Sequence, residues 1–131
     1  MSKDDLFNLQ KQVIDALDPV KFLDWLRSKD DGVVVGEVRS ASHCILACYL
    51  QDTLHRDIEV CHFHTQIISE GLVYTLTSAL DREHPGALPH PQWCSAFSRA
   101  GDKDTLTGTQ YTAAAAIAVF AQVFNYQKET V

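Results

Sequence analysis

Most of the side chains in this chain that could bind a metal or transfer a proton near neutral pH are concentrated in one short segment. Seven of its ten histidines and cysteines lie within residues 43–64, namely His43, Cys44, Cys48, His55, Cys61, His62 and His64. Cysteine and histidine are the usual ligands of zinc, and histidine is the common acid–base group at this pH. The function of this window depends on which of these side chains the fold brings together.

Three of these residues share one side of a predicted helix. Residues 43–54 are apolar nearly all round, and at about 100° per residue Cys44, Cys48 and His55 fall within about 40° of one another. They could supply three zinc ligands, with a histidine from elsewhere as the fourth. Structural zinc sites, however, favour close pairs of ligands on turns, so we interpret the cysteines, Cys61 included, mainly as small core residues. Cys44 is the best candidate for a reactive thiol, because a helix N-terminus stabilises a thiolate.

A β-hairpin is predicted for residues 58–80, with Glu70-Gly71 as its two-residue turn and Ser69 opposite Leu72. The alternation of side chains along such a strand decides which residues face the core.

On this hairpin, Cys61 points to the buried face, whereas His62 and His64 share the solvent face opposite Thr75 and Thr77. Two histidines one residue apart on a strand can bind a metal or act as a general base. The alternative is that they are ordinary surface histidines of a polar sheet face, and both interpretations stay open.

A second candidate site precedes the helix. Arg39, Ser40 and Ser42 lie between a short buried strand, residues 33–36, and the predicted helix start. Backbone N–H groups at a helix N-terminus together with an arginine can hold a phosphate or carboxylate. The segment lacks the glycines of a nucleotide-binding loop, and the serines could instead be helix caps.

The remaining periodicities predict an α+β fold, in which four or five helices pack on a small antiparallel sheet that strand 33–36 could join. One domain is expected for residues 1–131, with the N-terminal helix a candidate peripheral element. The further helices are predicted over residues 4–17, 19–31, 91–101 and 109–126.

The last predicted helix carries a flat surface of alanines. Ala114, Ala115 and Ala118 would let another backbone approach closely, either a helix of the same chain or the second copy of a homodimer.

Charge and hydropathy argue against two classes of partner, nucleic acids and membranes. Seventeen acidic against eleven basic residues give a net charge of −6, which argues against nucleic-acid binding. We expect no membrane span, because the longest apolar run, residues 113–124, is too short. Without an apolar leader, we expect a cytoplasmic protein with reduced thiols and no cofactor.

Three blocks of residues in a fixed order carry a resemblance. They are Val34-Val35-Gly36 with Arg39-Ser40, Cys44, Leu46-Ala47 and Tyr49-Leu50; Leu88-Pro89 with Trp93, Phe97, Arg99-Ala100 and Asp102; and Thr112-Ala113-Ala114 with Ala118-Val119. Over roughly residues 22–123 the chain resembles a group of small uncharacterised bacterial proteins. The resemblance implies a bacterial, or mobile-element-borne, cytosolic protein and brings no activity or catalytic residue with it.

Three functional hypotheses follow. No convergent catalytic set is found, so the leading one is a non-catalytic interaction module that self-associates or binds another protein through its acidic surface. The second is a small anionic ligand at Arg39, Ser40 and Ser42. The third is a metal-binding protein or metal-assisted hydrolase that uses His62 and His64 with a cysteine or histidine of the helix.

Overall fold

The computed structural model of the protein describes residues 1–80, 84–103 and 110–129, and these form five helices and two small, mostly antiparallel sheets. The predicted α+β class is confirmed. In chain order the elements are α1 (Lys3–Ala16), α2 (Pro19–Arg27), β1 (Val34–Glu37), α3 (Ile45–Leu54), β2 (Ile58–Val60), β3 (His64–Ser69), β4 (Leu72–Ser78), β5 (Leu88–Pro89), α4 (Gln92–Lys103), β6 (Gln110–Thr112) and α5 (Ala113–Glu129).

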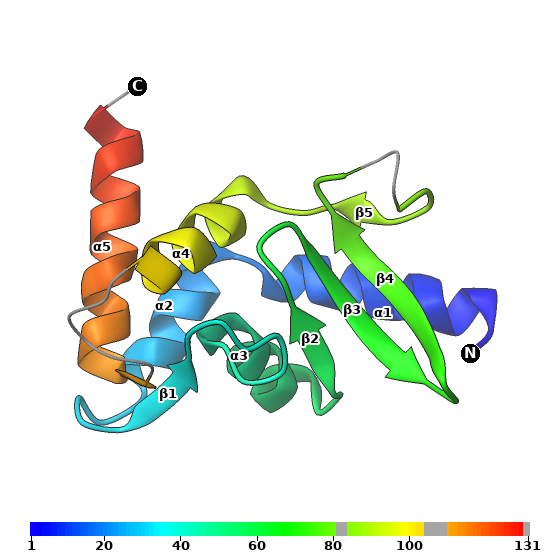
Figure 1. Cartoon of the computed structure of the whole chain (residues 1–131), viewed down its shortest axis with the longest axis horizontal. Helices are drawn as coiled ribbons and strands as arrows, with labels where there is room; N and C mark the ends of the chain where they lie inside the picture. The colour runs from blue at the N-terminus through cyan, green and yellow to red at the C-terminus, as the bar shows by residue number, and fades with distance from the viewer. Residues whose placement is uncertain (81–83, 104–109, 130–131) are drawn as a thin grey trace.

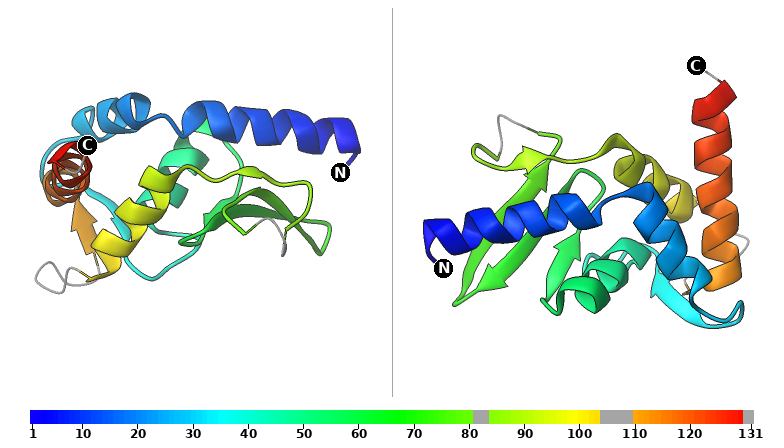
Figure 2. Two further views of the ribbon diagram at one scale, coloured as in Figure 1. Left: turned by 90° about the horizontal axis from the view of Figure 1, so that it is seen from above. Right: turned by 180° about the vertical axis from the view of Figure 1, so that it is seen from behind.

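The first two helices are separated where the sequence predicts a break. Asp18 is the N-cap of α2, and its carboxylate accepts the backbone N–H of Lys21 at 3.0 Å, with Pro19 in the first turn. Figure 2 shows α1 lying along one face of the larger sheet, and Leu9 and Val13 of α1 are buried in the common core.

The larger sheet has the strand order β2-β3-β4-β5, with the hairpin turn as predicted and Ser69 opposite Leu72. The predicted first strand is wrong in one respect, because residues 61–63 leave the strand direction and separate β2 from β3. Phe63, which strict alternation would place on the same buried face as Cys61, is 40% exposed as a result.

The register also changes inside the hairpin. Thr65 pairs with Thr77 but Gln66 pairs with Thr75, so Leu76 is an extra residue in β4. A one-residue shift turns each later side chain to the other face. Thr77, predicted to face solvent opposite His64, is therefore fully buried.

The smaller sheet joins two segments that are distant in sequence. β1 pairs antiparallel with β6, with Val34 opposite Thr112. The expectation that strand 33–36 joins the hairpin is therefore wrong, and residues 110–112, predicted as the start of a helix, form a strand before α5 begins at Ala113.

An aromatic cluster centres on Phe22, which is fully buried between helices. Its ring lies 5.2 Å from that of Tyr49 in α3, 5.1 Å from Phe97 in α4 and 6.0 Å from Phe120 in α5, measured between ring centres. This cluster packs α2 against α3, α4 and α5 at the end of the molecule where α2 and α5 lie side by side (Figure 1). Within the described residues, no helix is both long and apolar enough to cross a membrane.

Candidate functional site

The loop from β1 to α3 is shaped by a very close backbone approach. A Cβ atom at Gly36 would stand 2.6 Å from the backbone nitrogen of Ile45, so only glycine fits where β1 passes the start of α3. The loop that follows carries Arg39 in the left-handed region at φ 59°, which is unfavourable for a side chain with a Cβ.

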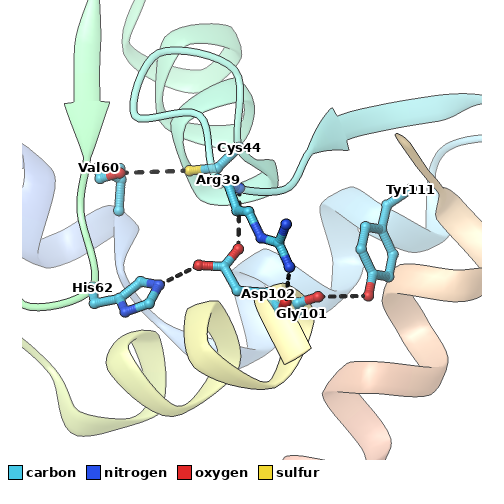
Figure 3. A network of polar contacts seen from close by, with 7 residues as sticks. All are labelled: Arg39, Cys44, Val60, His62, Gly101, Asp102 and Tyr111. Carbon is cyan, nitrogen blue, oxygen red and sulfur yellow. Dashed lines mark hydrogen bonds and ion pairs between the residues drawn. The ribbon is translucent and has the colours of Figure 1, made fainter. Parts of the chain in front are cut away.

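Asp102, in the last turn of α4, holds this loop in place. One carboxylate oxygen accepts the backbone N–H of Arg39 at 3.1 Å, and the other accepts a hydrogen bond from Nε2 of His62. The Arg39 guanidinium donates to the backbone carbonyl of Asp102 at 3.4 Å. Figure 3 shows Asp102 between the two side chains, so a single carboxylate connects the β1–α3 loop, the β2–β3 turn and α4.

The end of α4 is in turn anchored to the smaller sheet. The hydroxyl of Tyr111, in β6, donates to the carbonyl of Gly101 at 2.9 Å. The buried side chain of Tyr111 therefore fixes the position from which Asp102 reaches the loop.

A pocket of about 350 Å³ lies among these three segments. Its walls are largely apolar, and its polar groups are gathered along the loop and at the end of α4. The lining residues are Glu37, Val38, Arg39, Ser40, Ala41, Cys44, Ile45, Leu46, Val60, Cys61, His62, Phe97, Ser98, Gly101 and Asp102.

Two of the three residues predicted to hold an anion line this pocket, Arg39 and Ser40. Ser42 does not, because its hydroxyl lies 2.8 Å from Nδ1 of His43 and its carbonyl accepts the side-chain amide of Gln51. Neither serine caps α3.

Cys44 is the N-cap of α3, and its sulfur accepts the backbone N–H of Ala47 at 3.4 Å. The thiol points to the carbonyl of Val60 at 3.8 Å (Figure 3). Burial is the largest effect and raises the pKa of Cys44 to about 12, although the N–H of Ala47 opposes it. The thiol is therefore protonated at neutral pH, and the N–H groups of the first turn of α3 are directed at sulfur rather than at a ligand.

The remaining members of the histidine and cysteine window do not converge. Cys48 donates to the carbonyl of His43 at 3.4 Å, and His55 is the exposed, left-handed C-cap of α3. Among the described residues, no three or more His, Cys, Asp or Glu side chains are grouped so that they could hold a metal ion.

His62 and His64, expected on one strand face, are directed to different neighbours. His62 lies in the turn before β3 and contacts Asp102, whereas Nε2 of His64 lies 3.1 Å from the side-chain oxygen of Gln66. The ring centre of His64 is 4.9 Å from that of His84. The interruption after β2 is the reason that the two predicted ligands are separated.

The sequence does not predict a buried row of hydrogen-bonded side chains that runs from β3 through β4 to His90. The hydroxyls of Thr65 and Thr77 are 2.6 Å apart, and that of Thr77 is 2.9 Å from Nδ1 of His90. Thr65 also accepts the backbone N–H of Thr77, and the Thr77 hydroxyl connects Thr65 to His90. Nε2 of His90 is buried and has no hydrogen-bond partner in the described structure.

The candidate self-association residues are only partly available. Ala114 and Ala118 are exposed on α5, whereas Ala115 is half-buried and packs against the core.

Comparison with known proteins identifies no matching family model, no similar curated protein and no similar solved structure. The resemblance to small bacterial proteins stays a prediction. The fold and site define an α+β protein with a polar-rimmed, apolar-walled pocket built around the Arg39–Asp102–His62 connection.

Proposed function

We propose that the protein binds a small ligand with an apolar body and an anionic head in the pocket beside Arg39. The observation that carries this proposal is that Arg39 and Ser40 line the same pocket as the apolar residues Ile45, Val60 and Phe97. A volume of about 350 Å³ is within the range that small-molecule sites occupy.

The hydrogen bonds already made in the pocket support an anion at Arg39. The Asp102 carboxylate is occupied by the N–H of Arg39 and by His62, so its charge is engaged within the protein. The guanidinium of Arg39 has five N–H donors, and its hydrogen bond to Asp102 employs the Nη2 group. The remaining donors are available for a carboxylate or phosphate, which arginine binds in a bidentate manner.

The test uses inorganic phosphate, benzoate and phenyl phosphate as probes in thermal unfolding. Phenyl phosphate should stabilise the protein most, by about 1.4 kcal/mol at a concentration tenfold above its Kd, because it combines head and apolar body. Arg39→Gln should abolish this shift, whereas Arg27→Gln, a change of an exposed arginine at the end of α2, should preserve it. No shift with any probe at millimolar concentration, or an equal shift in both variants, would contradict the proposal.

A second proposal is self-association through the start of α5, which retains the interaction-module hypothesis. Ala114 and Ala118 are exposed there, and the neighbouring Val34 is 50% exposed. The N–H of Ala113 donates to the carbonyl of Val33 at 2.8 Å, which places the exposed valines beside the alanines. Together they form an apolar surface of the kind that homodimers bury.

Light scattering at about 100 µM should then give twice the monomer mass. Ala118→Glu should restore the monomer, and Gln12→Glu, which adds the same charge on exposed α1, should not. A monomeric wild-type protein at this concentration would refute self-association.

A further inference from the structure

Two partly buried histidines from separate segments lie close together beside the larger sheet. His64 begins β3, and His84 lies beyond the end of β4. Their ring centres are 4.9 Å apart and their planes are inclined by 42°. Both side chains are partly accessible to solvent, so a small ion can reach them.

The hydrogen bonds around His64 determine which ring nitrogen carries its proton. The side-chain nitrogen of Gln66 donates to the carboxylate of Glu59 at 2.8 Å, so the oxygen of Gln66 faces His64. That oxygen can only accept, so Nε2 of His64 must donate to it, at 3.1 Å. In this tautomer Nδ1 of His64 carries the lone pair, which is the form that binds a metal.

His84 is oriented by a similar contact. Its Nδ1 lies 2.9 Å from the hydroxyl of Ser78, which also accepts the backbone N–H of Leu80. This contact orients the ring, and in the tautomer whose Nδ1–H donates to the Ser78 hydroxyl, Nε2 carries the lone pair that an ion can bind. Metal-binding histidines are typically held in this way through the nitrogen that does not bind the ion.

We infer that His64 and His84 form a binding site for a divalent transition-metal ion such as Zn²⁺ or Ni²⁺. An imidazole nitrogen at 2.0–2.1 Å from an ion puts the ring centre about 3.2 Å away, so two ligands at 90–110° have ring centres about 4.5–5.2 Å apart. The observed 4.9 Å lies within this range. In this site His64 is paired with His84, which is distant in sequence, and not with His62 as predicted.

The rest of the neighbourhood leaves the ion with open positions. No third His, Cys, Asp or Glu of the described residues joins the pair, so water or a small ligand completes the coordination. His90, whose ionisation is influenced by His64, is kept neutral by burial, which lowers its pKa to about 4. It adds no positive charge that would repel the ion.

The site is tested by titrating the metal-free protein with Zn²⁺, followed by calorimetry and by nitrogen NMR of the histidine rings. Before zinc is added, the NMR spectrum should show His64 protonated at Nε2. On addition, Nδ1 of His64 and Nε2 of His84 should shift while the Nε2–H of His64 persists. His84→Asn should weaken zinc binding at least tenfold, and Gln66→Leu about tenfold because the ring of His64 is no longer oriented.

Two controls separate this site from other zinc ligands. His55→Asn changes a solvent-exposed histidine to a residue that tolerates its left-handed backbone, and Cys48→Ala removes a partly accessible thiol. Both should bind zinc as the wild type does. Unshifted ring nitrogens of His64 and His84, or an affinity that His84→Asn leaves unchanged, would overturn the inference, and the ring shifts are read on the wild type even if a variant fails to fold.

Discussion

The substitution Gly36→Ala should be among the most damaging single-methyl changes in this protein. The added Cβ would stand 2.6 Å from N and 2.7 Å from Cα of Ile45, and 2.9 Å from the carbonyl carbon of Cys44. All three atoms belong to the backbone at the start of α3, so no side chain can rotate away. Overpacking of this kind typically destabilises by 1–3 kcal/mol, and we expect about 3 kcal/mol here because the neighbours are rigid.

Urea unfolding followed by tryptophan fluorescence measures this change, and Gly32→Ala is the matched control. A Cβ at Gly32 meets nothing within 4 Å, and Gly32 is not in the left-handed region, so alanine there should stabilise by about 0.5 kcal/mol through the unfolded state. The midpoint of thermal unfolding should fall by roughly 10 °C for Gly36→Ala alone. If the free energies of unfolding of the two variants agree within about 0.5 kcal/mol, the argument from close backbone approach is refuted.

Two further predictions concern titratable groups. Burial, aided by the positive charge that His64 can carry, lowers the pKa of His90 to about 4, so between this value and about 6.5 the unfolded chain binds more protons than the folded one. The free energy of unfolding should therefore fall by about 3 kcal/mol as the pH decreases from 6.5 to 4, and His90→Gln should remove this part of the pH dependence. Urea unfolding of the metal-free proteins measures this. If the free energy of unfolding changes with pH equally in the wild type and in His90→Gln, the prediction is contradicted. Burial raises the pKa of all four cysteines and does so most strongly for Cys44 and Cys94. These two should therefore be the last to react with iodoacetamide at pH 8, as peptide mass spectrometry would show. Alkylation of Cys94 as fast as that of Cys48 would contradict this order.

The parts of the fold that follow from local chemistry could be predicted from the sequence. Glu70-Gly71 is a short-range turn signal, and it places Ser69 opposite Leu72 as observed. Asp18-Pro19 likewise marks a helix start through contacts within one turn. Neither depends on what the rest of the chain does.

The extra residue at Leu76 could not be predicted, because the alternation of residues 72–78 is compatible with an unbroken register. β6 is too short for periodicity to distinguish it from the start of a helix, and its partner β1 is distant in sequence. Tertiary pairing, rather than local preference, decides both features.

The candidate site was anticipated only where its residues are neighbours in sequence. Arg39 and Ser40 adjoin the start of a helix, which identified them. The link from His62 to Asp102 joins residues forty positions apart and has no sequence signal, because it depends on where α4 ends against the loop. The same is true of His64 and His84, which are brought together by the return of the chain beyond β4.

The pairing of β1 with β6 affects how the protein folds during its synthesis, because the two strands are far apart in the chain. The strands of the larger sheet are close in sequence, and β2, β3 and β4 can pair as soon as residues 58–78 have been synthesised. β1 emerges earlier but acquires its partner only when residues 110–112 follow. Until then its backbone donors and acceptors are an open strand edge that other chains can occupy. A nascent chain that stalls before β6 would therefore present Val34 and Val35 as a site for aggregation, while the completed protein closes that edge with one of its last segments.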